Sequence, residues 1–329
     1  MKESDIRPKD LHDEYIRLSS IDSLEYFPIN KKRFPIDCPA CLKNNLAHSF
    51  KKEGFDYVSC KDCGTLFASP RPPLEDFVKF YEDSPSSSYW ANVFFPTVAD
   101  ARRESMFAPK VKEITDLFKK KNFNIETVID VGAGHGIFLE EWQKLNLESK
   151  IFAVEPGKEL ANICRSKGIE TLEKIVEEAD EYSNKGDLVT SFEVIEHCTN
   201  PLEYVQSLKN LAKDGGYVLI SGVSIDGFDI QILGKESKTI APPYHINFIS
   251  VEGFYALFKL AGFSEVEVIT PGKLDLDIVL NSLQEDKLQS SGLNFLNIIN
   301  KRGKSTRDLF QQFLRDANMS SHIWVIAKK

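Results

Sequence analysis

The sequence of 329 residues lacks two kinds of segment that would direct it to a membrane. It has no uninterrupted apolar run of the roughly 18–20 residues that a membrane-spanning helix requires. Its first residues, Met1–Asp13, carry charges throughout and contain no apolar stretch, so they do not have the pattern of a signal peptide. We therefore expect a cytoplasmic protein without a membrane span.

The chain also has fewer basic than acidic residues. The chain has 41 Lys and Arg against 49 Asp and Glu, which gives a formal net charge of −8. Proteins that bind nucleic acid or anionic membranes normally carry a basic surface, so this balance argues against both kinds of partner. The length indicates one small and one larger unit, and the apolar share of 42% is sufficient for a core.

Cysteine is sparse, but four of the six cysteines form two close pairs. Cys38 and Cys41 make one C-x2-C knuckle, Cys60 and Cys63 make the other, and 18 residues separate the knuckles. Two such turns can complete the tetrahedral coordination of one ion, so the pattern predicts a structural zinc ribbon over about residues 37–70. Four reduced cysteines without a metal, or a redox pair, are the alternative interpretation.

From Thr127 onward, short apolar runs alternate with amphipathic stretches, which predicts a doubly wound α/β sheet. We expect an N-terminal metal-binding region over residues 1–95 and an α/β domain over residues 96–329, with a helical insert at about 272–320. The expected strands are Val128–Val131, Ile151–Val154, Ile169–Leu172, Leu188–Phe192, Tyr217–Ser221, Glu265–Ile269 and His322–Ala327, and the helices between the early strands are Ile137–Leu145, Glu159–Ser166 and Leu202–Leu211.

A glycine loop with the spacing G-x-G-x-G follows the first of these strands. It consists of Gly132, Gly134 and Gly136, and Asp130 lies just before it at the end of the strand. The dinucleotide-binding fingerprint would have Gly or Ala at its third position, where this chain has Ile137. A second acid, Glu155, ends the next strand. A carboxylate there can accept hydrogen bonds from both hydroxyls of a ribose, each worth roughly 1.5–3 kcal/mol.

These residues resemble the cofactor site of class I S-adenosylmethionine-dependent methyltransferases, and the resemblance extends from about Val128 to the C-terminus. It implies a seven-stranded Rossmann-like sheet in which the last strand inserts antiparallel beside the sixth. It also implies S-adenosylmethionine as cofactor. The cofactor-binding residues implied are Asp130, Gly132, Ala133, Gly134, Gly136, Glu155, Pro156 and Glu193.

Two further segments follow strands and are expected at the carboxyl edge of the sheet, where ligands bind in open α/β folds. The first, Ser191–Cys198, resembles the motif after the fourth strand of small-molecule methyltransferases, which implies that Glu196 and His197 face the acceptor. His197 is the candidate general base. In the second segment, Tyr244 and His245 are candidate acceptor contacts, together with Asn247. An ordinary packing role for either histidine remains the alternative.

The order of parts is similar to that of bacterial nucleotide-sugar and surface-polysaccharide methyltransferases, in which a zinc-binding domain precedes the catalytic core. The resemblance is carried by the two knuckles, the continuation Cys63–Pro72, the pair Tyr89–Trp90 and the pair Glu196–His197. It implies a carbohydrate-related small-molecule acceptor. The chain lacks the long second C-terminal domain of the sugar C-methyltransferases, so O-methylation of the acceptor is also open.

Two alternative functions remain. One is an RNA methyltransferase that binds its substrate through the ribbon, and the other is a non-catalytic module that binds the cofactor. The sequence does not specify an oligomeric state.

Overall fold

The computed structural model describes residues 3–284 and 294–329, and the chain divides into two compact units. The first unit comprises Met1–Val98, Val223–Phe254 and Ile269–Ile323. The second comprises Ala99–Gly222, Tyr255–Val268 and Trp324–Lys329. Each unit is therefore assembled from segments that lie far apart in the sequence.

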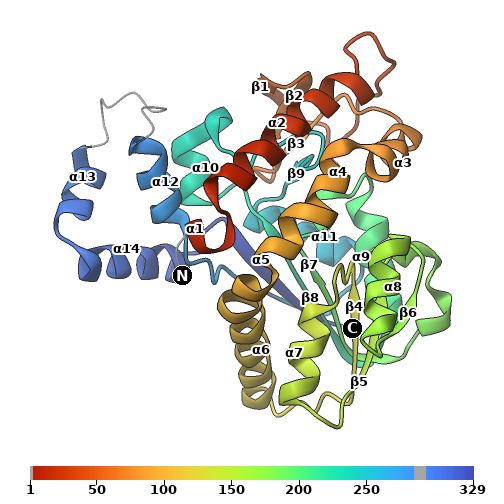
Figure 1. The fold of residues 1–329 in the computed structure, drawn as a ribbon. Coiled ribbons are helices and arrows are strands. Elements are labelled where there is room, and N and C mark those ends of the chain that lie inside the picture. The colour runs from red at the N-terminus through yellow and green to blue at the C-terminus, as the bar shows by residue number, and fades with distance from the viewer. Residues whose placement is uncertain (1–2, 285–293) are drawn as a thin grey trace. The chain divides into compact units, whose positions relative to one another are not determined.

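A seven-stranded sheet is the centre of the second unit, as the sequence predicts. Its strand order is β10-β11-β8-β7-β4-β5-β6 (Figure 1). Neighbouring strands from β8 to β6 pair in parallel, so their carboxyl ends meet at one edge. The strands are β4 (Thr127–Val131), β5 (Lys150–Val154), β6 (Glu170–Leu172), β7 (Gly186–Phe192), β8 (Ala212–Val223), β10 (Glu265–Ile269) and β11 (His322–Lys328).

The last strand, β11, lies between β8 and β10. Lys329 donates its backbone N–H to the carbonyl of Gly216 near the start of β8, with N···O 3.0 Å. Ser224, just after the end of β8, donates to the carbonyl of Ser321 at 2.8 Å. The start of one strand thus pairs with the end of the other, which makes β11 antiparallel to β8 and confirms the predicted topology.

The helices of this unit follow the predicted spacing of apolar residues. Helix α6 buries Val111, Ile114 and Phe118 at intervals of three and four residues. The helical segment that leads into β4 is interrupted by a π turn, η2 (Arg103–Phe107), because Pro109 has no N–H to continue the α-helical pattern. The bounds are α5 (Phe95–Arg102), α6 (Ala108–Lys120), α7 (Ile137–Leu145), α8 (Lys158–Ser166), α9 (Pro201–Leu211) and α11 (Val251–Leu260).

The first unit contains a four-stranded sheet in the order β1-β2-β3-β9. Strands β1 (Leu46–Lys52), β2 (Phe55–Cys60) and β3 (Leu66–Ala68) come from the predicted ribbon, whereas the two-residue strand β9 (Asn247–Phe248) comes from a distant segment. Aromatic rings fill the core beside this sheet, and they include Phe27, Phe55, Tyr57, Phe77, Phe80, Tyr244 and Phe248. The N-terminal helices are α1 (Glu3–Ile6), α2 (Lys9–Tyr26), α3 (Leu74–Asp83) and α4 (Pro85–Tyr89), followed by the π turn η1 (Trp90–Phe94).

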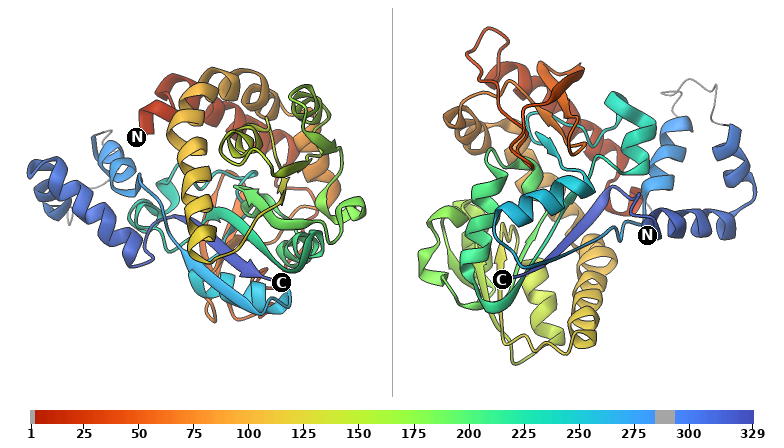
Figure 2. Two further views of the ribbon diagram at one scale, coloured as in Figure 1. Left: turned by 90° about the horizontal axis from the view of Figure 1, so that it is seen from below. Right: turned by 180° about the vertical axis from the view of Figure 1, so that it is seen from behind.

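The predicted helical insert has its own apolar cluster. Helices α12 (Asp275–Gln284), α13 (Asn294–Lys301) and α14 (Lys304–Asp316) belong to it, and α10 (Phe228–Leu233) packs against α12 (Figure 2). Residues 285–293 of the expected insert lie outside the described residues. Within the described ranges, no helix combines the length and apolarity needed to cross a membrane.

The buried carboxylate of Asp275 connects the two ends of the insert through hydrogen bonds. It accepts hydrogen bonds from Gln311 Nε2 (2.6 Å), Ser320 Oγ (2.6 Å) and the backbone N–H of Ser321 (2.7 Å). The base of α12 is thereby joined to α14 and to the chain that enters β11. Asp229 of α10 is fully buried nearby, and burial together with the charge of Asp275 raises the pKa of Asp229 to about 7.

We expect Asp229→Asn to change how stability depends on pH. Because the folded-state pKa lies above the unfolded value, folding is favoured by a protonated Asp229 and loses stability as pH rises toward about 7. Asparagine has no proton to lose. The free energy of unfolding of the variant relative to the natural protein should therefore increase by about 2 kcal/mol between pH 5 and pH 8, as measured by urea unfolding. Asp308→Asn, at an exposed position, should show no such trend.

Candidate functional site

The glycine loop connects the end of β4 to the start of α7, and all three of its glycines have positive φ angles. A Cβ atom on Gly132 would lie 2.7 Å from Val194 Cγ2, and one on Gly136 would lie 3.0 Å from Cys164 Sγ. A Cβ on Gly134 would meet no atom within 4 Å. Tight packing therefore requires the outer two glycines, whereas the middle one borders open space that a ligand can approach.

Glu155, which follows β5, is tied directly to this loop. Its Oε2 accepts a hydrogen bond from the backbone N–H of Gly134 at 2.7 Å, and its Oε1 accepts one from Gly157 at 2.9 Å. Burial raises the pKa of Glu155, and the two N–H donors act against that rise. A carboxylate has about four acceptor positions, so two of them remain for hydroxyl groups of a ligand. Ala133 and Pro156, two more predicted cofactor contacts, are the chain neighbours of these residues.

Asp130 lies in the interior at the end of β4. Thr190 of the adjacent strand β7 donates its hydroxyl proton to Asp130 Oδ1 at 2.7 Å. Burial raises the pKa of Asp130 to about 7, while the Thr190 hydrogen bond and the positive charge of Lys110 oppose the shift. The pKa of this carboxyl therefore lies well above that of an ordinary surface aspartate.

Lys110 is a residue of this site that the sequence reasoning missed. It is only 8% exposed, and its Nζ lies 4.1 Å from the centroid of the Phe192 ring. Burial lowers the pKa of Lys110, and the charges of Glu193 and Asp130 raise it. A signal was present, because Lys110 precedes Ile114 by four residues and so occupies the apolar face of α6, where a lysine is unusual.

The loop after β7 carries three of the predicted residues. Glu193 has a φ of 56°, and its Oε1 accepts a hydrogen bond from Ser221 Oγ at 2.6 Å. Glu196 is buried, and neither of its carboxylate oxygens has a hydrogen-bond partner among the described residues. Burial, with a smaller contribution from Glu193, raises the pKa of Glu196 well above its usual value. His197 ends the short turn η5 (Ile195–His197) and is partly exposed.

Tyr244 and His245 belong to the other compact unit, where each has partners of its own. The Tyr244 hydroxyl lies 2.8 Å from Ser86 Oγ and 3.0 Å from Ser87 Oγ, inside the aromatic core. Nδ1 of His245 lies 2.6 Å from the carbonyl oxygen of Thr239. Since a carbonyl oxygen only accepts, Nδ1 carries the proton, and in a neutral ring Nε2 is then the nitrogen with the acceptor lone pair.

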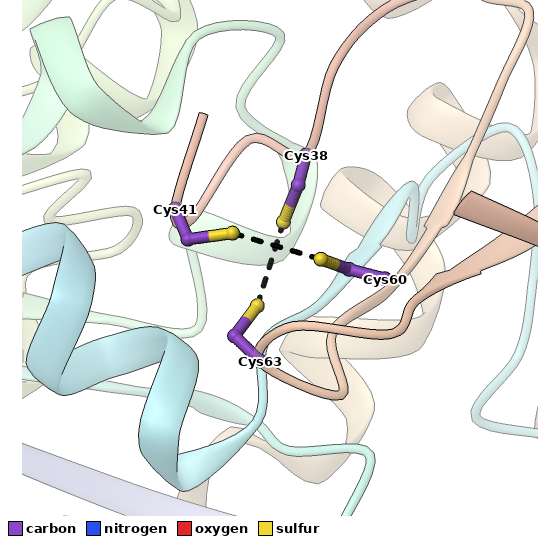
Figure 3. Close-up of side chains that lie close together, drawn as sticks. All are labelled: Cys38, Cys41, Cys60 and Cys63. Atoms are coloured by element: carbon purple, nitrogen blue, oxygen red, sulfur yellow. Dashed lines mark hydrogen bonds between the residues drawn. The ribbon is translucent and has the colours of Figure 1, made fainter. Parts of the chain in front are cut away.

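The four knuckle cysteines converge on one point, as Figure 3 shows. The Sγ atoms of Cys38 and Cys63 are 3.5 Å apart, those of Cys41 and Cys60 are 3.6 Å apart, and all four lie within 4.8 Å of one another. A zinc ion with four tetrahedral Zn–S bonds of ~2.3 Å requires sulfur separations of about 3.8 Å. Positive φ angles at Leu42 and Gly64 allow the tight turns that bring the thiols together. The cluster therefore fits a four-cysteine metal centre.

Comparisons with known proteins agree with this geometry. A family model described as "Methyltransferase domain" matches residues 100–268. The Ubiquinone biosynthesis O-methyltransferase of Colwellia psychrerythraea (strain 34H / ATCC BAA-681) is 30% identical over 133 residues, which cover 38% of this chain and 53% of that protein. The protein of the same name from Proteus mirabilis (strain HI4320) is 34% identical over 115 residues, covering 33% of this chain and 44% of that one. The chain thus spans about half the length of the curated relatives it matches.

A solved structure also shares the fold. The plantazolicin methyltransferase BamL, in complex with a triazolic desmethylPZN analog and SAH, aligns with 77% of this chain and 94% of its own, with a TM-score of 0.51 and 13% sequence identity. At this level of identity the likeness concerns the fold alone.

We expect Lys110→Met to raise the pKa of Asp130 further above its value of about 7, because the substitution removes the positive charge that favours the carboxylate. Titration of the Asp130 carboxyl carbon by NMR measures this shift, with Asp130→Asn used to assign the signal. Lys112→Met, at an exposed position of the same helix, should leave the pKa of Asp130 unchanged.

Proposed function

The chain belongs to the methyltransferase domain family, and on that premise we propose that it transfers the methyl group of S-adenosylmethionine to a hydroxyl group of a small molecule. The observation that carries the proposal is the hydrogen bond that joins the glycine loop to Glu155. It creates, beside the open space at Gly134, a carboxylate that retains two acceptor positions.

The residues of the site fit the parts of this cofactor. Glu155 would accept hydrogen bonds from the two ribose hydroxyls, and the glycine loop would lie against the methionine and ribose part. Lys110 would provide a positive charge toward the cofactor carboxylate, a group for which a buried ammonium is well suited. When bound, S-adenosylmethionine supplies a methyl group on a sulfonium, and the chain has to align the acceptor with it and remove the acceptor's proton.

Proton removal is assigned to the loop after β7. Glu196 is deeply buried, and burial raises its pKa well above the usual value, which favours its protonated form more than in an exposed glutamate. His197 is the more accessible of the two and, as a neutral imidazole, would accept the hydroxyl proton while the acceptor oxygen bonds to the methyl carbon. His245, with Nε2 as an acceptor, and Tyr244 are further candidates for contact with the acceptor.

Two classes of acceptor are supported by different observations. The relatives that match at 30–34% identity are named for O-methylation in ubiquinone biosynthesis, which favours a hydroxyl of a small ring compound. The paired cysteine knuckles in front of the core favour the carbohydrate-related acceptors of the nucleotide-sugar methyltransferases. We place the ring hydroxyl first, because the sequence similarity to these O-methyltransferases supports it. Zinc at the four cysteines is part of the proposal, as a structural ion.

We expect Glu155→Gln to weaken S-adenosylmethionine binding at least about tenfold, since a neutral amide replaces the charged acceptor of the ribose hydroxyls. Isothermal titration calorimetry on the full chain measures the affinity. Glu159→Gln, at an exposed position four residues later, is the matched control and should bind as the natural protein does. Equal affinity of the Glu155→Gln variant would contradict the assigned cofactor site.

We expect label from methyl-labelled S-adenosylmethionine to appear on the hydroxyl oxygen of a dihydroxylated aromatic compound. Nucleotide-sugars and RNA fragments are incubated in parallel under the same conditions, and the labelled product is identified by mass spectrometry. Label on a nucleotide-sugar would replace the first acceptor class by the second, and label on RNA would contradict both. Cofactor binding with transfer to none of them would support a non-catalytic module.

A further inference from the structure

The segment Tyr244–Ser250, which we call the histidine segment, has very little regular structure of its own. Only Asn247 and Phe248 are in a strand, β9, and the residues around them form turns or irregular backbone. A segment without internal hydrogen bonding takes its conformation from the groups that contact it. The contacts of this segment therefore determine where His245 is held.

Most of these contacts come from the N-terminal region of the same unit. The Tyr57 hydroxyl donates to the carbonyl of His245 at 2.7 Å, and the backbone N–H of Ala68 donates to the carbonyl of Ile246 at 2.9 Å. The buried guanidinium of Arg71 donates to the same Ile246 carbonyl at 3.2 Å and to the side-chain oxygen of Asn247. Strand β3 pairs with β9 in antiparallel register. The middle of the histidine segment is thus held by residues that follow the first cysteine knuckle.

The end of the histidine segment is connected to the cysteine cluster itself. Ser250 Oγ donates to the backbone carbonyl of Cys63 and accepts from the N–H of Gly253 at 2.9 Å, so it also caps helix α11. Thr65 Oγ1 accepts from the backbone N–H of Ser250 at 3.3 Å and from the Cys63 thiol at 3.3 Å. One hydroxyl, that of Thr65, therefore contacts both the fourth sulfur of the cluster and the last residue of the histidine segment.

The second cysteine knuckle of the cluster also lies directly before β3, the strand that pairs with the histidine segment. Cys60 ends β2, Cys63 lies in the turn that follows, and β3 begins at Leu66. An ion bound by all four sulfurs would fix this turn, and with it the position of β3 relative to β2. Without an ion the turn keeps its backbone hydrogen bonds, from the Cys60 N–H to the Thr65 carbonyl at 2.9 Å and from the Gly64 N–H to the Cys60 carbonyl at 2.8 Å. It would lose the bonds through the metal to the first knuckle, and the position of β3, and with it that of β9, would be less restrained.

We propose that metal binding at the four cysteines sets the conformation of the histidine segment, with Thr65, Arg71 and Ser250 as the positioning residues that connect the two. The role of His245 toward the methyl acceptor rests on the proposed function, whereas the effect of the metal on the segment does not. The metal region is accordingly a support for the histidine segment and has no need to contact RNA.

Hydrogen–deuterium exchange of the full chain tests this, with one equivalent of zinc confirmed by native mass spectrometry and with zinc removed by a chelator. Removal should speed amide exchange in residues 245–250 at least about tenfold, and leave exchange in α7 and α12 unchanged. Unchanged exchange in the histidine segment would overturn the proposal. So would a uniform increase over the whole first unit, because the metal would then support that unit's fold as a whole.

Thr65→Val removes the hydroxyl that contacts both Cys63 and Ser250 without removing a metal ligand. It retains all four cysteines and nearly the same side-chain volume. The variant should still contain one equivalent of zinc, yet show faster exchange at the amides of residues 250–253. With an acceptor in hand, kcat should fall while the KM for S-adenosylmethionine stays constant. Ser49→Ala is the matched control, because its hydroxyl pairs with Ser59 on the same sheet and should affect neither readout.

Zinc-bound Thr65→Val that exchanges like the natural protein would contradict the assigned connection. Failure of the proposed function would look different. In that case the natural protein with bound zinc would show no affinity for S-adenosylmethionine, while the exchange of the histidine segment would still respond to the metal.

Discussion

The hydrogen bond from the Gly134 backbone to Glu155 is the contact on which the geometry of the proposed cofactor site depends. It joins a loop after β4 to the end of β5, and both strands are parallel neighbours in the sheet. The sheet brings the two ends to one edge, where the Gly132 N–H also donates to the Val154 carbonyl at 2.8 Å, and the Glu155 contact fixes the middle of the loop. It has a cost, because the carboxylate is withdrawn from water, and the second donor at Gly157 offsets part of that cost.

The same unit contains two buried ionisable side chains whose pKa values depend on each other. Asp130 and Lys110 lie in the interior of the same unit, and each shifts the other toward the charged form while burial opposes it. Such mutual support is what allows ionisable groups to persist inside a protein. The cysteine cluster of the other unit is different, since a zinc ion bound there would be held by four thiolates whose mutual repulsion the ion's charge would offset.

The sequence was sufficient to predict the central strands β4, β5, β7 and β8, because a buried parallel strand is a short apolar run. It also predicted the two knuckles and the insertion of the last strand. It did not reveal β9, since two residues cannot show a periodicity, and Asn247 joins the sheet only because Leu66 and Phe67 present free backbone groups. Tyr244 shows the same limit: its hydroxyl binds serines more than 150 positions away, and no local pattern encodes that contact.

The position of β11 has a consequence for how the chain is made. Both neighbours of this strand, β8 and β10, are synthesised earlier, and neither can bond to the other across the gap that β11 fills. Until residues 322–328 emerge, each of them presents an open edge of unpaired backbone groups in the nascent chain. The helical insert, placed between β10 and β11 in the sequence, lengthens that interval. Nascent chains of this protein therefore present these edges to strand-mediated association until β11 has been synthesised.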